Sequence, residues 1–411
     1  MKKIITLLLL FSVSAFAGKG SIYSRFGIGD INPLVSGRTV GMGNTGVALL
    51  GDGYINDLNP AALANISHTV ITADYQFQNL TAADPGGTSI LNNGNISGFS
   101  LAFPVYAPKK MVLSLAVLPY SSVGYEQQQS QNVGKDAVTI TQMYEGRGGL
   151  TSGQLSLSYA PSPNFLVGVT THYLFGAIYS DQTINFDSPD FFGGSYNQTM
   201  SMRGFGFTLG GIYSGIDKAL GLSDGHHLNL GATFFTGSSL TVDDETLRNF
   251  SSNRDTVAAK NHSLALPFGF STGLAYLRNN IVYAADVHFQ SWDNYKIRGV
   301  HPAELQNSIR FGAGAEFLQA KEFTDSFWEK LAYRIGGYYD QTNLKINGQS
   351  INGIFGTAGI GFPFSGDSRL NIGIEYGIRG TRTASLIEEN IFRMTFSLSA
   401  SETMFIQPPV E

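Results

Sequence analysis

The sequence predicts an all-β protein, a transmembrane antiparallel β-barrel of about 14 strands whose lumen is closed by an N-terminal hatch. Three observations predict this fold. The chain begins like an exported protein, the segments from Ser67 onward alternate apolar and polar residues between turns, and the composition is rich in glycine and aromatics, with 49 Gly, 29 Phe and 19 Tyr. Alternation of this kind is typical of strands that face lipid on one side, and aromatic residues suit the membrane interfaces.

Residues 1–17 have the pattern of a signal peptide. Lys2 and Lys3 precede an apolar core from Ile4 to Phe11, and the small-x-small sequence at residues 15–17 precedes the expected cleavage after Ala17. This pattern predicts export across the inner membrane. The chain has no cysteine, which excludes disulfides, thiolate metal sites and an N-terminally lipidated cysteine.

Residues 18–66 are predicted to form an N-terminal arm and a hatch, or plug. The part from Gly37 to Ile66 has neither strand alternation nor a helical period, and it is broken by five glycines and Pro60. A short helix is expected at residues 60–65, because Asn59 can cap it and proline suits the first helical position. We expect this segment to lie compactly inside the barrel.

Residues 67–406 are predicted to form the barrel, and residues 407–411 a C-terminal tail. No run of 18 apolar residues follows the signal peptide, so the chain is expected to cross the membrane with strands. Several segments exceed the roughly 10 residues that cross a bilayer, and their outer ends should project beyond it. The expected strands are 67–79, 95–107, 110–126, 138–161, 163–185, 196–216, 225–243, 259–278, 280–298, 304–320, 328–347, 352–364, 368–382 and 389–405.

The alternation places a set of charged residues in the lumen. In the segment 368–382 the even positions are apolar while the odd ones carry charges or glycine, so the odd face should point away from lipid. We favour the interpretation that these charged side chains pair with one another, stiffen the wall and anchor the hatch. The alternative is that they guide the carboxylate of a ligand. The predicted lumen charges are Asp286, Arg310, Glu316, Arg334, Asp340, Arg369, Glu375, Arg379 and Arg393.

The links between strands divide by length. Residues 86–93, 187–196 and 243–261 are polar and are expected to be outer loops, whereas 161–163, 278–280 and 365–367 fit tight periplasmic turns. Counted along the predicted strands, these turns follow the fourth, ninth and twelfth. That order is not a strict alternation, so we expect an error in the strand boundaries.

Two motifs that suggest catalysis fit their context poorly. Residues 41–46 match G-x-G-x-x-G, but no βαβ unit surrounds them, and Ser271 lies in a G-x-S-x-G pattern inside an alternating segment. No Ser/His pair is expected on one face, so an outer-membrane hydrolase is disfavoured. The acidic residues 243–245 lack the spacing of a calcium loop. We therefore predict no enzyme activity, no cofactor and no metal.

Two elements of the N-terminal region resemble the FadL/TodX family of outer-membrane transporters for hydrophobic compounds. They are Gly41-Met42-Gly43 and, further along, Asn59-Pro60-Ala61-Ala62-Leu63-Ala64. The residues Asn56-Asp57-Leu58 replace the usual aromatic before the second element, and the chain continues to Glu411 beyond Phe405, where many barrels end on an aromatic residue. Signal, hatch and about 14 strands follow in the family's order.

The resemblance implies an outer-membrane channel in which fatty acids or aromatic hydrocarbons pass a hatch and leave laterally. It implies a monomer that contacts outer-membrane lipid or lipopolysaccharide, and the formal charge of −5 with scattered basic residues makes nucleic acid an unlikely partner. Its candidate gating residues are Gly41, Met42, Gly43, Asn59, Pro60 and Ala61, for which close packing against the wall is the alternative role.

A second function fits the same fold, that of a plugged barrel acting as a protein-interaction or secretion-associated outer-membrane component. The two functions predict different interiors. A transporter should have a connected apolar pocket beside the hatch and a kinked strand that opens the wall, whereas an interaction protein should have a sealed wall.

Overall fold

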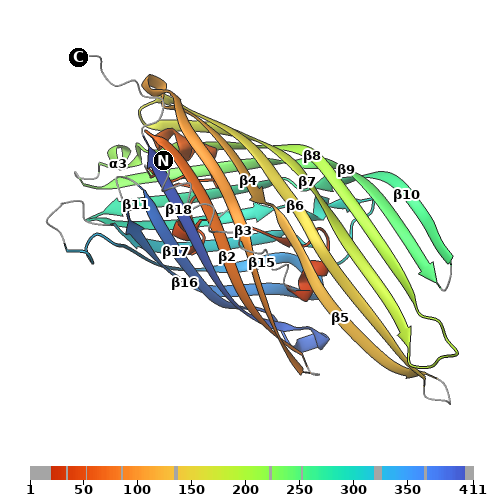
Figure 1. Ribbon diagram of the computed structural model, residues 1–411. Helices are drawn as coiled ribbons and strands as arrows, with labels where there is room; N and C mark the ends of the chain where they lie inside the picture. Colours follow the sequence, from red (N-terminus) through yellow and green to blue (C-terminus); the bar gives the residue numbers. More distant parts are fainter. Residues whose placement is uncertain are drawn as a thin grey trace, which may run out of the picture.

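The computed structural model describes residues 20–33, 36–51, 53–84, 87–133, 138–221, 225–250, 253–318, 326–364 and 368–402. The predicted signal peptide at 1–17 and the predicted tail at 407–411 lie outside these residues. Within them the wall is a closed antiparallel β-barrel of 14 strands, which confirms the predicted fold class (Figure 1). No helix in this part of the chain is long and apolar enough to cross a membrane.

The elements follow one another around the wall, preceded by short helices and one short strand. They are η1 (Ile22–Arg25), β1 (Asp30–Ile31), α2 (Gly37–Val40), η2 (Pro60–Asn65), β2 (Thr69–Asp84), β3 (Gly87–Tyr106), η3 (Ala107–Lys109), β4 (Met111–Pro119), β5 (Ser121–Val133), β6 (Val138–Ser162), β7 (Phe165–Phe186), β8 (Gly194–Tyr213), α3 (Ile216–Ala219), β9 (His227–Phe250), β10 (Asn253–Leu266), β11 (Gly269–Arg278), β12 (Ile281–Gln290), η4 (Trp292–Asn294), β13 (Lys296–Ile297), β14 (Ser308–Phe317), β15 (Ala332–Ile346), β16 (Gln349–Pro363), β17 (Arg369–Gly380), η5 (Thr383–Ser385) and β18 (Glu388–Glu402).

The barrel closes where the last strand pairs with the first. β18 and β2 form a continuous antiparallel ladder from Glu402↔Thr69 to Glu388↔Ala83. Two wall strands are interrupted. β4 and β5 are halves of one strand broken at Tyr120, and β10 and β11 are halves of another broken at Pro267 and Phe268.

The turns obey a strict alternation, because the turn at 278–280 follows the eighth predicted strand and not the ninth. The expected errors in the strand boundaries also occurred, since β2 extends to Asp84 and β3 begins at Gly87. The links at 162–165, 278–281 and 363–369 follow the fourth, eighth and twelfth wall strands and lie at one end of the barrel, which we take as periplasmic. Two predicted outer loops were wrong. Residues 87–93 belong to β3, and residues 243–250 and 253–261 pair in the β9–β10 ladder.

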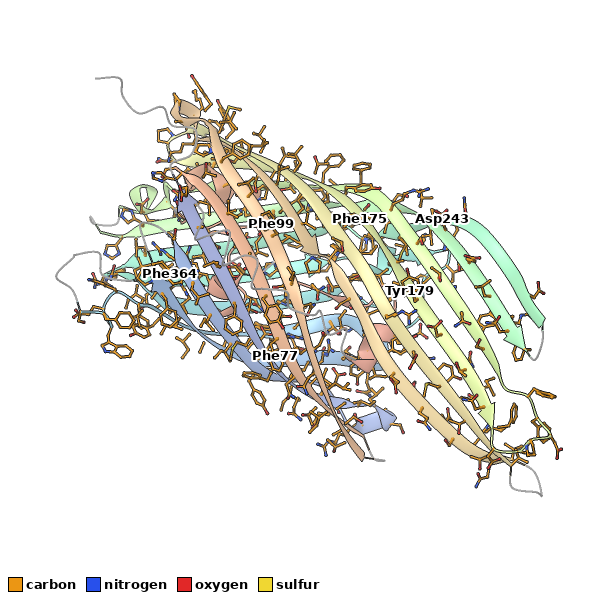
Figure 2. The ribbon with its side chains drawn as sticks, in the orientation of Figure 1. Phe77, Phe99, Phe175, Tyr179, Asp243 and Phe364 are labelled. Carbon is orange, nitrogen blue, oxygen red and sulfur yellow. The ribbon has the colours of Figure 1, made fainter. Side chains whose placement is uncertain are left out.

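A belt of apolar side chains covers the outside of the wall. Phe77, Phe99, Phe175 and Tyr179 point away from the barrel and are more than a third exposed (Figure 2). In β17 and β18 the even-numbered residues face outward and the odd-numbered ones inward, as the alternation predicts. Strands β6 to β9 have 20 to 25 residues each, and polar outer ends extend beyond the belt.

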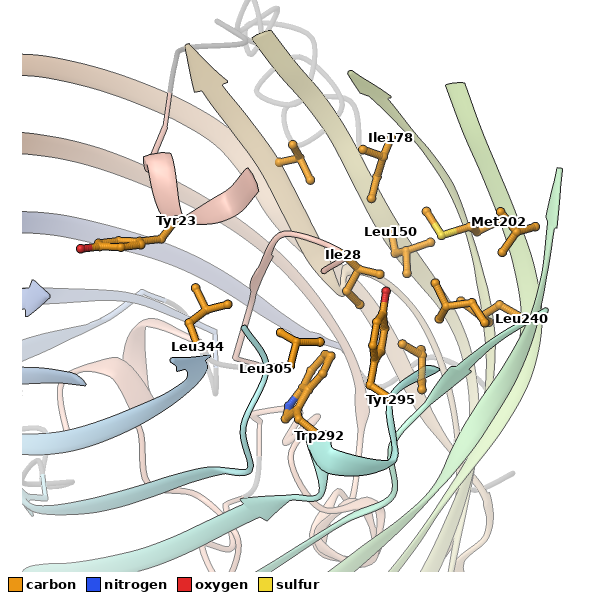
Figure 3. Close-up of a cluster of buried hydrophobic side chains, with 14 of the residues drawn as sticks. Tyr23, Ile28, Leu150, Ile178, Met202, Leu240, Trp292, Tyr295, Leu305 and Leu344 are labelled. Atoms are coloured by element: carbon orange, nitrogen blue, oxygen red, sulfur yellow. The ribbon is translucent and has the colours of Figure 1, made fainter. Parts of the chain in front are cut away.

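The largest hydrophobic core lies inside the outer half of the barrel. It joins Tyr23 and Ile28 of the N-terminal region with Trp292 and Tyr295 from the segment between β12 and β14 (Figure 3). The inward-facing residues Leu150, Leu174, Ile178, Met202, Leu240 and Leu264 of strands β6 to β10 complete it. These buried apolar side chains therefore fix the N-terminal region to the inner wall.

Candidate functional site: the inner segment and the opening in the wall

The described residues between 20 and 66, which we call the inner segment, lie against a row of inward-facing wall glycines that we call the glycine belt. A Cβ atom built at Gly314 would lie 2.4 Å from the Met42 carbonyl oxygen, and one at Gly231 would lie 2.2 Å from the Val47 carbonyl oxygen. Only glycine lets the two backbones approach so closely. The belt consists of Gly168, Gly210, Gly231, Gly312, Gly314, Gly336, Gly359 and Gly373, on seven wall strands.

The Gly41-Met42-Gly43 element is buried in the middle of this contact. Gly43 has φ of +71°, and a Cβ there would lie 2.5 Å from the carbonyl oxygens of Ala313 and Gly337. Its N–H donates to Thr357 Oγ1 at 2.9 Å. Both the left-handed backbone and the close approach require glycine at this position.

The Asn59-Pro60-Ala61 element forms the predicted short helix, as a 3₁₀-helix. The Asn59 side chain accepts from the Ala61 N–H at 3.0 Å, and its Nδ2 donates to the Val47 carbonyl at 2.7 Å. Pro60 packs on two glycines of the belt, Gly168 and Gly210. Asn59 therefore caps the helix and ties it to the preceding loop with one fully buried side chain.

One predicted lumen charge holds the inner segment through backbone groups. Asp286 of β12 accepts from the N–H groups of Gly46 and Val47 at 2.6 and 2.9 Å, and the side chain is buried. A carboxylate that accepts two N–H groups makes charge-assisted hydrogen bonds, which are stronger than neutral ones. The sequence alone does not show this role of Asp286, because it depends on where the inner segment lies.

Two buried ion-pair networks join the inner segment to the wall. Arg38 donates to Glu316 of β14 at 2.6 Å, and the same carboxylate accepts from Arg334 of β15 at 2.8 Å. Burial opposes the charged form of Arg38, yet the Glu316 carboxylate leaves the pKa of Arg38 above its usual value. In the second network Arg379 bridges Glu389 at 2.7 Å and Asp30 of the inner segment at 3.1 Å.

Other predicted charges pair within the wall. Arg310 donates to Asp340 at 2.7 Å, and Arg393 donates to Glu375. Both pairs join neighbouring strands, β14 with β15 and β17 with β18, and their side chains line the lumen. Arg369 is half-buried at the start of β17.

The wall opens between β3 and β5. β3 pairs with β2 along nearly its whole length, but with β4 only from Phe99↔Val117 toward the periplasmic end. Beyond the break at Tyr120, β5 turns toward β6, and Figure 1 shows β3 and β5 diverging. Along the described residues, 88–98 of β3 therefore have no ladder partner on the β5 side.

The inner segment binds the edge of β5 that β3 leaves free. β1 pairs with β5 through Asp30↔Ser122, and the Asn32 N–H donates to the Tyr120 carbonyl at 3.0 Å. The Gly20 N–H donates to the Gly124 carbonyl. Because an unpaired backbone is costly in a membrane, these bonds allow the wall to stay open at this level.

A cavity of about 370 Å³ lies between the inner segment and the inner face of the wall and extends to the borders of this opening. Asn93 and Asn95 of β3 line it on one side, and Ser122 and Gly124 of β5 on the other. The lining is mixed rather than the apolar surface expected of a hydrocarbon pocket. It includes Gln76, Gln78, Gln154, Thr170, His172, Thr208, Ser271, His288, Arg310, Asp340, Glu375 and Arg393, together with Tyr338 and Phe355.

The expectation that no serine and histidine share a face was wrong. Ser271 Oγ lies 2.9 Å from His288 Nδ1, because β11 and β12 pair in register at these residues and both side chains face the cavity. Ser271 nevertheless lies within a regular ladder whose strand is paired on both sides, so its backbone offers no strained nucleophile turn. We assign no reaction to this pair.

The acidic residues 243–245 do not converge. Asp243 faces Arg203 on the outside of the wall, whereas Asp244 binds Arg298 on the inside. In the described part of the chain no three His, Asp or Glu side chains lie together as metal ligands would.

Solved structures share this architecture. A Pseudomonas aeruginosa FadL homologue matches with a TM-score of 0.61 and 14% identity, over 91% of this chain and 99% of that one. The P. putida toluene transporter TodX matches with a TM-score of 0.59 and 14% identity, over 93% and 100%. The Ralstonia pickettii toluene transporter TbuX matches with a TM-score of 0.56 and 11% identity, over 92% and 99%. The resemblance to FadL and TodX is therefore confirmed as a shared fold.

These matches show that the protein shares the β-barrel fold of the FadL and TodX structures. No curated protein sequence matches the chain. A family model described as BamG matches residues 1–409, which is nearly the entire sequence, and the chain therefore belongs to the BamG family.

Proposed function

We propose that this protein is a passive outer-membrane channel through which hydrophobic small molecules pass between the outer surface, the lumen and the bilayer. The opening between β3 and β5 carries the proposal, because it joins a cavity inside the barrel to the lipid-facing surface. Apolar Ile96 and Phe99 are exposed on the outer face of β3 beside it. A molecule that partitions into lipid could leave through such an opening without crossing the polar layer outside.

The names of proteins with the same fold support this class of function. TodX and TbuX are described as toluene transporters, and CymD, with a TM-score of 0.55 and 13% identity over 93% of this chain, as a monoaromatic hydrocarbon channel. Fatty acids and aromatic hydrocarbons are accordingly the first candidates for the ligand. The mixed lining of the cavity is the feature that departs from a pure hydrocarbon pocket.

In this proposal the inner segment serves as the hatch that controls passage. Gly41, Met42, Gly43, Asn59, Pro60 and Ala61 form its most closely packed part. Passage toward the periplasm would require a second arrangement of the segment, because the backbone contacts on the glycine belt leave no space for a ligand.

Blocking the opening with a thiol-reactive label tests the route. The protein has no native cysteine, so the label reacts only with an introduced one. Asn95→Cys places a thiol at the border of the opening, facing the cavity, while Asn92→Cys places one on the exposed face of the same strand. A bulky maleimide on Asn95→Cys should slow uptake of labelled oleate and toluene by reconstituted vesicles at least fivefold. The label on Asn92→Cys should have little effect. Uptake no faster than in empty vesicles would refute the channel function.

A second function, protein interaction, is favoured by the outer edges of the same opening. Residues 88–98 of β3 and 125–133 of β5 together hold one charged residue, Glu126, and no proline. Free edges normally carry charges or proline that prevent pairing with other chains, so two unprotected edges suit a strand from a partner. Ile90→Lys with Gln128→Lys should then abolish a cross-linked complex in intact outer membranes. Persistence of that complex would exclude these edges as the interface.

A further inference from the structure

We propose that the cavity binds an uncharged head group rich in hydroxyl groups, whose apolar chain leaves through the opening between β3 and β5. The preferred ligand is then an amphiphile of the glycolipid or alkyl glycoside class, bound more tightly than a hydrocarbon or a free fatty acid. This inference rests on the proposed channel function for the route of the apolar chain, and it names the substrate class.

One side of the cavity offers neutral hydrogen-bonding groups from adjacent strands. His172 of β7 contacts Thr208 of β8 at 2.7 Å, and His288 of β12 contacts Ser271 of β11 at 2.9 Å. Thr170 and Thr233 line the same side. Hydroxyl and imidazole groups can each act as donor or acceptor, which matches a ligand that presents several hydroxyl groups.

Two buried polar atoms in the lining have no hydrogen-bond partner among the residues that the structure describes. They are Asn44 Oδ1, an acceptor on the inner segment, and Gln154 Nε2, a donor on β6, and their residues are 3% and 6% exposed. Arg310 Nε is a third such atom. A hydroxyl group can donate to the first and accept from the others, whereas a hydrocarbon would leave all three without a partner.

The charges in the lining favour a neutral head group. The guanidinium groups of Arg310 and Arg393 are already paired with Asp340 and Glu375, and that of Arg379 with Asp30 and Glu389. Each carboxylate therefore neutralises a cation that a fatty acid head group would need. The lining holds four acidic side chains and three arginines, which further disfavours an anion.

An aromatic pair lies among these charges. Tyr338 and Phe355 stack with ring centroids 4.7 Å apart, and both line the cavity. The pyranose ring of a sugar has an apolar C–H face and a polar rim, so aromatic rings beside carboxylates and guanidinium groups suit it. The cavity of about 370 Å³ has room for a head group of one or two sugar rings but not for a complete lipid.

Binding can be measured with the protein's own tryptophan. The sequence has two tryptophans, of which Trp292 lines the cavity and Trp328 is 68% exposed, so Trp328→Phe leaves one reporter. The probes are octyl glucoside below its micellar concentration, octanoate and toluene, added to protein in nanodiscs. We expect saturable binding of octyl glucoside at least tenfold tighter than that of octanoate or toluene. Equal or tighter binding of octanoate or toluene would overturn the inference.

Variants separate the head-group site from general partitioning into the barrel. Gln154→Leu should weaken octyl glucoside binding at least fivefold and leave toluene binding unchanged, whereas Gln349→Leu, exposed at the start of β16, should change neither. An unchanged affinity for octyl glucoside in a folded Gln154→Leu protein would overturn the inference, with folding checked by circular dichroism. If the protein takes up toluene but does not prefer octyl glucoside, only the head-group site is refuted. If it binds octyl glucoside selectively but takes up no probe, only the channel function is refuted.

Discussion

The buried contact of Arg38 with Glu316 gives a sharp test of how firmly the inner segment is held. Arg38→Met removes a guanidinium that donates three hydrogen bonds of 2.6 to 3.2 Å to one carboxylate. Loss of one member of a buried pair costs roughly 3–5 kcal/mol. Glu316 keeps Arg334 as a partner, so the lower end applies, and docking of the segment should weaken by about 3 kcal/mol.

Hydrogen exchange in detergent micelles measures this loss. A change of about 3 kcal/mol corresponds to roughly 100-fold faster exchange of the amides in residues 37–50, if these open locally. The control is Arg310→Met, which breaks the Arg310–Asp340 pair within the wall and should leave exchange in residues 37–50 nearly unchanged. Equal exchange in Arg38→Met and wild type, or an equal effect of the control, would show that the ion pair does not hold the segment.

Three further variants probe the same contact. Asn59→Ala removes the cap of the short helix and should lower stability by about 1–2 kcal/mol, seen as a lower thermal midpoint. Gly314→Ala puts a methyl group against the Met42 carbonyl and should expose the inner segment to added protease, while cleavage as slow as in wild type would contradict the close contact. Burial raises the pKa of Asp57 to about 6, with an opposing hydrogen bond from Ser100. The Asp57 carboxyl therefore binds its proton at a higher pH in the folded protein than in the unfolded chain. The free energy of unfolding should rise as pH falls from 6 toward 4, and Asp57→Asn should abolish this rise.

The wall could be predicted from the sequence because lipid imposes a period of two on every strand. Alternation in β17 and β18 identified their outward faces, and 14 strands were placed in the right order. Errors occurred where a strand leaves the membrane. The sequence of residues 243–261 is rich in polar residues and lacks the alternation that marks a strand, although residues 243–250 and 253–261 pair in the β9–β10 ladder, with a register shift between Thr256 and Ala258.

The contacts of the inner segment could not be predicted, because they depend on which residues meet across the lumen. Glycines such as Gly314 and Gly359 read as turn or corner residues in the sequence, and only the position of the Gly41-Met42-Gly43 element shows that they make room for its backbone. The opening was equally hidden. Residues 110–126 alternate without a clear interruption, and the loss of pairing with β3 follows from a change of direction at Tyr120.

The two parts of the inner segment differ in what would have to break for them to move. The Gly41-Met42-Gly43 and Asn59-Pro60-Ala61 elements contact belt glycines on five strands, β7, β8, β14, β15 and β16, so displacing them would separate all of these contacts at once. The part near Asp30 borders the opening and pairs with β5 over two residues. Because this part lies at the border of the opening and Asp30 is held there by Arg379, a widening of the opening should begin at β1. We therefore expect Asp30→Asn to increase uptake more than a substitution of comparable effect on stability in the Gly41-Met42-Gly43 or Asn59-Pro60-Ala61 element. The reverse order would favour those two elements as the proposed gate.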